Sequence, residues 1–363
     1  MSKIRVLIVD DAVVIRRIVS DVLAGDPGIE VAGAAANGKI ALAKIPQVNP
    51  DLVTMDVEMP EMDGLAALAE IRKLYPRLPV VMFSTLTSRG ASAALDALAA
   101  GANDYVTKPS NVGNVQEAMQ RIREELIPKI KGLCRKHTDP VTAANSIHVS
   151  PPTTRALSAM KPSGRVEVVV IGISTGGPNA LAEVIQALPR DLPVPVLVVQ
   201  HMPPVFTRVL AERLNQKSQV SVKEAQDSEE VLPSTVYIAP GDYHMTLQHK
   251  MSRLLIGLNQ GMPENSCRPA VDVLFRSAAA VLGGSVLGVV MTGMGQDGLR
   301  GSEAIREAGG CVIAQDEATS VVWGMPGFVA KAALAAQLVP LPQIALAIAR
   351  RVMEHRTVSR RSA

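Results

Sequence analysis

Residues 168–188 read VVVIGISTGGPNALAEVIQAL, a stretch that predicts both an α/β fold and a reactive serine. Residues 168–171 form an apolar, β-branched run, which is typical of a buried parallel strand. Pro178 stands where a helical pattern begins, and its missing N–H is tolerated there. Ser174 is therefore expected on a tight strand-to-helix turn, with backbone N–H groups pointing toward its hydroxyl. An exposed serine nucleophile is built in this way.

The same turn has two simpler interpretations. Glycine-rich turns between strand and helix often bind phosphate, but GISTGG has neither the dinucleotide-binding spacing nor a following lysine. A structural turn without chemistry is the other alternative. The turn alone favours a nucleophile and a phosphate-binding site about equally. The polar residues at the other strand ends are needed to choose between these two interpretations.

Composition excludes several classes of protein. The 363 residues suffice for two domains, and their cores are aliphatic because 47% of residues are hydrophobic but only 2% aromatic. No apolar run is long enough for a membrane span, and the start MSKIRVLIVDD predicts a strand rather than a signal peptide. Three scattered cysteines favour a reducing cytoplasm. A net charge of +3 without interleaved aromatic residues predicts no nucleic-acid binding.

Strands and helices alternate in the N-terminal part, which indicates a doubly wound parallel sheet. Ligands of such sheets bind beyond the carboxyl ends of the strands. The predicted strands comprise residues 4–9, 30–34, 51–56, 79–83 and 105–107. The polar residues at the ends of these strands are Asp10, Asp11, Asp56, Ser84 and Lys108.

These residue types are suited to phosphoryl transfer onto an aspartate. Three carboxylates at one sheet edge repel one another, and Mg²⁺ relieves that repulsion while keeping waters for a phosphate. Lys108 and the Ser84 hydroxyl add donors for the phosphoryl oxygens. A surface cluster of helix-capping acids is the simpler alternative, but it does not account for a lysine at a separate strand end.

The segments LIVDD, DLVTMDVEMPEMDG, VVMFSTLT and DYVTKP resemble the signature strand ends of response-regulator receiver domains, over roughly residues 3–125. The resemblance implies that a histidine kinase supplies a phosphoryl group to Asp56. It also implies Asp10, Asp11 and Asp56 as Mg²⁺ ligands. Lys108 would contact the phosphate, and Ser84 would supply the switch hydroxyl.

The C-terminal part repeats the alternation, and three of its strand ends carry Ser174, His201 and Asp297. Neighbouring strand ends converge without strain, so the three form a candidate triad. In it Ser174 attacks a carbonyl, His201 takes the proton, and Asp297 orients the imidazole. The backbone N–H groups of Thr175 and Met294 are candidate oxyanion donors. The predicted strands after Ser174 comprise residues 194–199, 234–240, 250–258, 285–291 and 311–315.

Each of these residues also has a simpler interpretation. A histidine at a strand end is more often a hydrogen-bonded loop residue, and His244 competes with His201 because it also follows a strand. Asp297 among glycines suits an Asx turn. Together, however, the three residues favour acyl transfer by serine, with no cofactor in this domain.

Three rival functions stay open. A DNA-binding output domain is disfavoured because the chain has no helix-turn-helix pattern and no basic recognition helix. A phosphate- or nucleotide-binding module would use the GISTGG turn without chemistry. A metal hydrolase is disfavoured because His201, His244 and Asp297 have no recognisable ligand spacing.

The segments IGISTGGP, VVQHMPP, YIAPGDYHM and VVMTGMGQDG resemble the catalytic domain of the chemotaxis protein-glutamate methylesterases (CheB family), which follows a receiver and a linker. The resemblance implies Ser174, His201 and Asp297 as the triad. It also implies hydrolysis of glutamate methyl esters, and deamidation of glutamines, on methyl-accepting chemoreceptors. We therefore expect a phosphorylation-activated cytoplasmic hydrolase, with a receiver (1–130), a flexible linker (131–165), a catalytic domain (166–352) and a basic tail (353–363).

Overall fold

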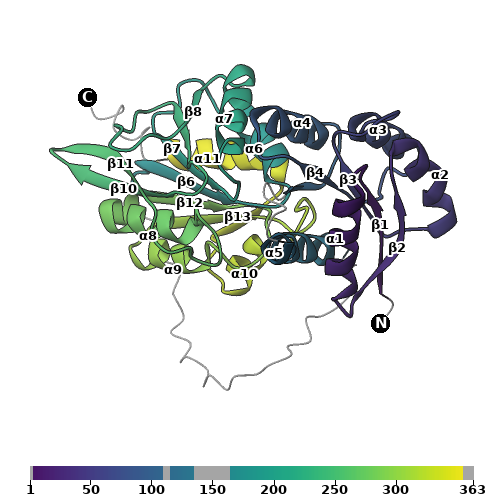
Figure 1. The fold of residues 1–363 in the computed structure, drawn as a ribbon. Coiled ribbons are helices and arrows are strands. Elements are labelled where there is room, and N and C mark those ends of the chain that lie inside the picture. Colours follow the sequence, from purple (N-terminus) through teal and green to yellow (C-terminus); the bar gives the residue numbers. More distant parts are fainter. Residues whose placement is uncertain (1–2, 109–114, 135–163, 355–363) are drawn as a thin grey trace.

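The computed structural model describes residues 3–108, 115–134 and 164–354, so most of the predicted linker and tail lie outside it. The described chain forms two main sheets, each of parallel strands with helices on both faces, at the two ends of an elongated molecule (Figure 1). This arrangement confirms the predicted pair of doubly wound α/β domains. No described helix is long and apolar enough to cross a lipid bilayer.

The first sheet has five strands in the order β2-β1-β3-β4-β5. Helices α1 and α5 pack together on one face, and α2, α3 and α4 cover the other (Figure 1). Strands β3 and β4 are buried along their whole length, which explains their apolar sequences. The elements are β1 (Ile4–Val9), α1 (Val13–Ala24), β2 (Ile29–Ala35), α2 (Gly38–Val48), β3 (Leu52–Asp56), α3 (Gly64–Leu74), β4 (Val80–Ser84), α4 (Ser88–Ala99), β5 (Asp104–Thr107) and α5 (Val115–Leu133).

The second main sheet has seven parallel strands in the order β14-β13-β12-β6-β7-β9-β8. Helices α6, α7 and α11 cover one face, and α8, α9 and α10 cover the other (Figure 1). The elements are β6 (Val168–Ile173), α6 (Gly177–Gln186), β7 (Val196–Gln200), α7 (Phe206–Lys217), β8 (Ser221–Glu224), β9 (Thr235–Ile238), β10 (His244–Lys250), β11 (Arg253–Asn259), α8 (Val271–Leu282), η1 (Gly283–Ser285), β12 (Val286–Val290), α9 (Leu299–Glu307), β13 (Cys311–Gln315), α10 (Met325–Lys331), β14 (Gln337–Val339), η2 (Leu341–Gln343) and α11 (Ile344–Met353).

Each of these two sheets has one point where the chain reverses its direction of winding. In the first sheet this point lies between β1 and β3, and in the second it lies between β6 and β12. Strand ends on either side of such a point diverge into a crevice, where open α/β sheets bind their ligands. The topology therefore places one candidate site at the ends of β1 and β3, and another at the ends of β6 and β12.

One local feature differs from the sequence expectations. The predicted strand at 250–258 is β11, which pairs antiparallel with β10 instead of joining the parallel sheet. Met251 and Ser252 connect the two strands with positive φ angles of 47° and 62°. Such hairpin turns usually carry Gly, Asn or Asp, so the sequence gives no signal for this one. Helix α5 continues through Pro128 to Leu133, so it includes the first residues of the segment 131–165.

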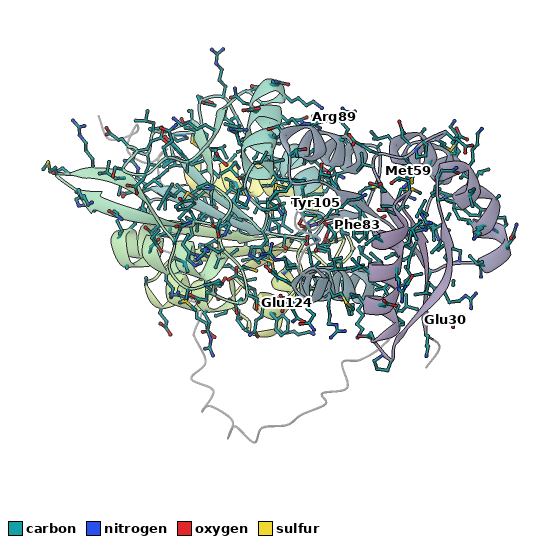
Figure 2. All side chains as sticks on the ribbon, in the orientation of Figure 1. Glu30, Met59, Phe83, Arg89, Tyr105 and Glu124 are labelled. Atoms are coloured by element: carbon teal, nitrogen blue, oxygen red, sulfur yellow. The ribbon has the colours of Figure 1, made fainter. Side chains whose placement is uncertain are left out.

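An aromatic pair joins the two domains. Tyr105 of β5 stacks on Phe206 of α7, with ring centroids 4.7 Å apart and planes inclined by 7°, and both side chains are buried. Figure 2 shows Tyr105 and Glu124 on the side of the first domain that faces the second, and Glu30 far from it. Strand β5 and helix α5 therefore form part of the interdomain boundary.

Polar contacts at α4 extend this boundary. Arg213 of α7 donates to the backbone and side-chain oxygens of Ser92, at 2.8 and 2.7 Å, and pairs with Asp96 at 2.8 Å. Asn179 of α6 donates to the carbonyl of Leu98 at 2.8 Å. The first domain is thus held against α6 and α7, directly beyond the Ser174 turn.

Candidate active site

A rigid turn holds Ser174 at the end of β6. Its N–H donates to the Thr292 carbonyl (3.0 Å), and its carbonyl accepts from the Gly177 N–H (2.7 Å). Gly176 caps α6 with a φ of 76°, in the left-handed region that favours glycine. A Cβ at Gly177 would lie only 1.9 Å from Gln200 Oε1, so any larger residue there would displace the Gln200 side chain. The half-buried Ser174 lines a cavity of about 460 Å³ between the domains.

His201 follows β7 beside this turn, and its N–H donates to the Ile173 carbonyl at 3.1 Å. Ring atom Nε2 lies 2.7 Å from Asp297 Oδ2, and ring atom Nδ1 lies 3.6 Å from Cys267 Sγ. The imidazole is therefore held between a carboxylate and a thiol. Because Asp297 occupies Nε2, the nitrogen through which His201 can take a proton from Ser174 is Nδ1.

Asp297 lies buried behind His201, at the positive end of helix α8. The Val271 N–H donates to its Oδ2 (2.7 Å), and the Asp272 N–H and Asn265 Nδ2 each donate to its Oδ1 (3.0 Å). Burial alone would raise the pKa of Asp297, but the His201 imidazole and the backbone donors hold it below its usual value. The site therefore keeps this carboxylate ionised.

A second acid, Asp272, lies beside Asp297 and binds backbone N–H groups at the start of helix α9. It is buried, and its Oδ1 accepts from the Gly298 N–H at 2.9 Å and the Gly301 N–H at 2.7 Å. Its Oδ2 accepts from Asn265 Nδ2 at 3.0 Å. Burial raises the pKa of Asp272, and its hydrogen bonds only partly offset that effect. Asn265 thus bridges the two acids and fixes the distance between the starts of α8 and α9.

His201 is not hydrogen-bonded to Ser174 in this arrangement; within the described chain its ring bonds only to Asp297 and Cys267. Burial lowers the pKa of His201, but the adjacent Cys267 sulfur and the Asp297 carboxylate raise it, to about 10. The ring is therefore engaged by Asp297 and Cys267, and Ser174 has no hydrogen bond to its candidate base in the described structure.

Two backbone N–H groups beside Ser174 remain available to a ligand. Thr175 and Met294 both line the cavity, on the turns that follow β6 and β12. The Thr175 carbonyl is fixed by Thr292 Oγ1 at 2.9 Å. Among the described residues neither the Thr175 nor the Met294 N–H has an acceptor, as the predicted oxyanion role requires.

His244, the sequence's other candidate base, has both ring nitrogens in use elsewhere. Its Nε2 lies 3.0 Å from the Met262 carbonyl, and its Nδ1 accepts from the Ala270 N–H at 3.2 Å. The side chain is buried under the loop that precedes α8. Its contacts are those of a structural histidine, which leaves His201 as the candidate histidine that lines the Ser174 cavity.

Sequence reasoning missed Cys267, Asn265 and Asp272. All three belong to the segment NSCRPAVD (265–272), where only the start of helix α8 was predicted. The cysteines were considered only for disulfides and for metal-ligand spacing, and Cys267 meets His201 from 66 residues away in sequence. An acid in the first turn of a predicted helix, preceded by a proline, was the one local signal for Asp272.

The second candidate site joins the ends of β1, β3 and β5. Lys108 Nζ lies 2.9 Å from Asp10 Oδ2 and 2.7 Å from Asp56 Oδ2. Burial, together with the Asp10 charge, raises the pKa of Asp56 to about 6 despite the lowering effect of Lys108. Burial lowers the pKa of Lys108, but its two carboxylate partners raise it above its usual value. The structure thus brings these three predicted residues into one cluster.

The remaining predicted receiver residues lie beside this cluster. Asp11 is exposed, and one oxygen each from Asp10, Asp11 and Asp56 lies within 4.8 Å of the others. Such an all-oxygen set fits Mg²⁺, which prefers carboxylate ligands and water. Ser84 is buried at the end of β4, where its hydroxyl donates to the Gly90 carbonyl at 2.7 Å.

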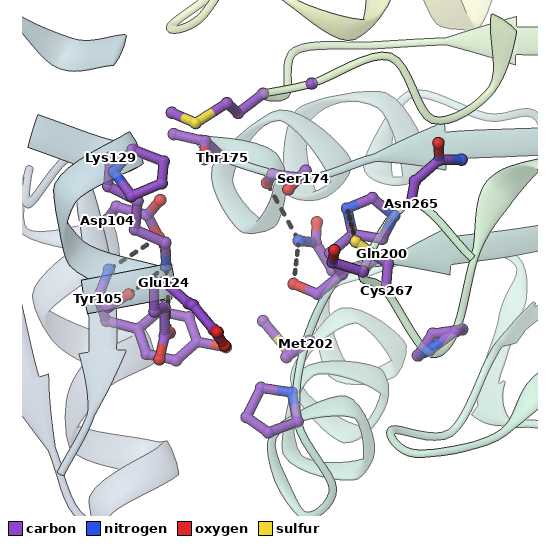
Figure 3. Close-up of a pocket in the computed structure, with 18 of the residues that line it drawn as sticks. Asp104, Tyr105, Glu124, Lys129, Ser174, Thr175, Gln200, Met202, Asn265 and Cys267 are labelled. Carbon is purple, nitrogen blue, oxygen red and sulfur yellow. Dashed lines mark hydrogen bonds and ion pairs between the residues drawn. The ribbon is translucent and has the colours of Figure 1, made fainter. Parts of the chain in front are cut away.

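The first domain lines the Ser174 cavity from the opposite side. Figure 3 shows Asp104, Tyr105, Glu124 and Lys129 across the cavity from Ser174. Lys129 pairs with Asp104 at 3.3 Å and lies over the Tyr105 ring, 5.1 Å from its centroid. Strand β5 and helix α5 therefore form one wall of the cavity that holds the candidate triad.

Two parallel-sheet domains of this kind define a class of protein, a response regulator whose output domain is a hydrolase. Residues 6–120 match the family model for the response regulator receiver domain, and residues 169–348 match that for CheB methylesterase. The chain belongs to the family of protein-glutamate methylesterases/protein-glutamine glutaminases.

Relatives and a solved structure agree on this family. A protein-glutamate methylesterase/protein-glutamine glutaminase of Trichodesmium erythraeum is 52% identical over 97% of this chain and 100% of its own length. One of that name from Nocardioides is 54% identical over 98% of this chain and 97% of its own length. The crystal structure of the Thermotoga maritima CheB methylesterase catalytic domain is 43% identical with a TM-score of 0.50, over 51% of this chain and 98% of that one.

Proposed function

We propose that this protein hydrolyses glutamate methyl esters, and deamidates glutamines, on methyl-accepting chemoreceptors in the cytoplasm, under the control of phosphorylation at Asp56. One observation carries the catalytic part. Ser174 and His201 line one cavity at the reversal point of the second main sheet, and Asp297 holds His201 from behind at 2.7 Å. The family membership favours the same substrate class.

The chemistry follows the geometry of the three side chains. Ser174 Oγ attacks the ester carbonyl carbon while His201 Nδ1 takes its proton, and Asp297 stabilises the resulting imidazolium. The N–H groups of Thr175 and Met294 donate to the oxyanion. The imidazolium then returns the proton to the departing methoxide, which leaves as methanol. A water, deprotonated by the same nitrogen, hydrolyses the glutamyl-Ser174 ester; a glutamine substrate releases ammonia instead.

Activation requires His201 to exchange its partner. Cys267 lies at the nitrogen that must face Ser174, so the His201–Cys267 contact has to open before proton transfer begins. The loop of Cys267 lines the cavity together with residues of β5 and α5. We propose that withdrawal of the first domain admits the substrate and allows this rearrangement.

Phosphorylation supplies the signal in this proposal. Asp10, Asp11 and Asp56 would hold Mg²⁺, and the bound cation would supply positive charge for the phosphoryl oxygens when a histidine kinase donates to Asp56. Lys108 would exchange its carboxylate partners for the phosphate, and Ser84 would turn from Gly90 toward it. Because β4 leads into α4 and β5 carries Tyr105, such a shift would reach both contacts with the second domain.

Methanol release from methylated receptor membranes tests the proposal. We expect release that increases with a small phosphodonor and Mg²⁺, and that disappears in Ser174→Ala under both conditions. Asp56→Asn should retain Ser174-dependent release but lose its response to the donor. Undiminished release from Ser174→Ala would refute the catalytic assignment, and a donor response in Asp56→Asn would refute the regulatory one.

A further inference from the structure

The contact between Cys267 and His201 has the dimensions of a metal site. Cys267 Sγ and His201 Nδ1 lie 3.6 Å apart, and both residues line the cavity. Zinc bonds to sulfur at about 2.3 Å and to imidazole nitrogen at about 2.0–2.1 Å. At a tetrahedral angle these bonds separate the two ligand atoms by about 3.6 Å. The observed separation of Sγ and Nδ1 therefore matches that of two ligand atoms on one tetrahedral zinc ion.

Asp297 completes the arrangement from the far side of the ring. A metal-bound histidine usually donates its other N–H to a carboxylate, which fixes the tautomer and makes the ligating nitrogen more basic. His201 Nε2 lies 2.7 Å from Asp297 Oδ2. The carboxylate is itself anchored by the N–H groups of Val271 and Asp272. Nδ1 is thus already oriented toward Cys267, as a ligand would be.

The thiol of Cys267 and the imidazole of His201 favour a softer metal ion than the carboxylates of the first domain do. Thiolate and imidazole favour Zn²⁺ and related transition metals, whereas carboxylate and water favour Mg²⁺. The cluster of Asp10, Asp11 and Asp56 offers only oxygen atoms. The two groups of ligands in this chain therefore differ in chemical class, and Mg²⁺ at the first does not compete for the second.

We propose that Cys267 and His201 form an inhibitory site for Zn²⁺. On binding, the Cys267 thiol and the Nδ1–H group of His201 each release a proton to solvent, and the neutral imidazole coordinates through Nδ1 while its Nε2–H donates to Asp297. Water fills the remaining coordination positions within the cavity. The bound ion occupies the nitrogen that must take the proton of Ser174, so hydrolysis stops. This inhibition rests on the function proposed above, but binding of the ion does not.

Cobalt binding tests the site independently of activity. Co²⁺ replaces Zn²⁺ in such sites, and a Co²⁺–thiolate bond gives a charge-transfer absorption in the near ultraviolet. The full chain, saturated with Mg²⁺, should develop this band with Co²⁺ and lose it on addition of Zn²⁺. Cys267→Ser and Cys267→Ala should lack the band, and Cys134→Ser should retain it. Cys134 is a suitable control because it is also partly buried, but its pKa is raised to about 12 by burial.

Methanol release then tests the inhibition. Zn²⁺ should inhibit the donor-stimulated protein, and EDTA followed by fresh Mg²⁺ should restore its rate. The half-inhibitory Zn²⁺ concentration should rise by on the order of tenfold or more in Cys267→Ser but not in Cys134→Ser. A cobalt band unaltered in both Cys267 variants, or equal Zn²⁺ sensitivity in all variants, would overturn the proposal. A Cys267-dependent band in a protein that releases no methanol would instead reject the proposed function and keep the site.

Discussion

Gly132 of α5 lies against Met294, so closely that a Cβ at position 132 would stand 2.5 Å from the Met294 methyl carbon. Gly132 belongs to the first domain, and Met294 lines the Ser174 cavity as a candidate oxyanion donor. The end of the receiver's last helix therefore rests directly on the loop that carries this candidate oxyanion donor. In the proposed gate, this contact belongs to the closed state, so a larger side chain at position 132 should disturb that state.

Gly132→Leu should accordingly raise methanol release in the absence of a phosphodonor. Overpacking costs about 1–3 kcal/mol, and the flexible end of Met294 keeps the cost near the lower bound. The donor-free rate should therefore rise by roughly fivefold, with a smaller rise in Gly132→Ala. Gly33→Ala is the control, because a Cβ there meets Leu7 and Val48 at an ordinary 3.6 Å. An unchanged donor-free rate in a stably folded Gly132→Leu protein would exclude α5 packing from the gate.

Arg213 offers a second way to loosen the closed state. Its ion pair with Asp96 and its bonds to Ser92 cross the domain boundary, but Asp96 is 56% exposed. Solvent screening limits such a pair to about 1 kcal/mol, so Arg213→Ala should raise the donor-free rate by up to roughly fivefold. Arg208→Ala is a matched control on the same helix. Arg208 also reaches the first domain, but its hydrogen bond to Ser88 Oγ is long, at 3.4 Å, and therefore weak. Equal rates for the two variants would contradict the assigned role of Arg213.

Local sequence patterns correctly predicted individual strands and the residues that follow their ends. Strand β13 occupies its predicted residues 311–315, and β1 its predicted residues 4–9, because buried parallel strands are written as short apolar runs. The strand-end rule likewise located Ser174, His201 and Asp297, since parallel strands expose their carboxyl ends at one edge of the sheet.

The features that could not be predicted from the sequence depend on contacts between segments that are distant along the chain. The loop that carries Cys267 is held by Arg268, whose guanidinium bonds to Asp242 at 2.9 and 2.5 Å. That pairing, and the resulting contact of Cys267 with His201, leave no periodic pattern in the sequence. The packing interface between the two domains could not be predicted for the same reason. In the sequence, Tyr105 and Phe206 each look like ordinary core residues, and only the packed structure shows that they stack on each other.

Removal of Mg²⁺ should separate the two halves of the function. EDTA should abolish stimulation by the phosphodonor, since the proposed phosphoryl transfer to Asp56 uses Mg²⁺ held by Asp10, Asp11 and Asp56. It should leave Ser174-dependent release measurable, because the proposed hydrolysis uses Ser174, His201 and Asp297 without a metal. Methanol release is recorded with and without donor, and Mg²⁺ added in excess of EDTA should restore the donor response. Complete loss of donor-free release with EDTA would contradict the metal-independent mechanism.

Asp297→Asn should produce the largest loss of rate after replacement of Ser174 or His201. The amide NH₂ of Asn at this position would donate to His201 Nε2, and the proton would then sit on Nδ1, the nitrogen that must accept from Ser174. An equivalent change of tautomer in a serine triad lowers kcat by about 10⁴.

Asn265→Ala provides a milder comparison with Asp297→Asn. It removes only one donor to Asp297 Oδ1, while the Asp272 and Gly298 N–H groups remain. Its kcat should fall by roughly tenfold, with KM for the receptor little changed, as measured by methanol release from donor-stimulated protein. If Asn265→Ala were as inactive as Asp297→Asn, or if Asp297→Asn kept more than about a tenth of the kcat, Asp297 would not be the residue that sets the imidazole tautomer.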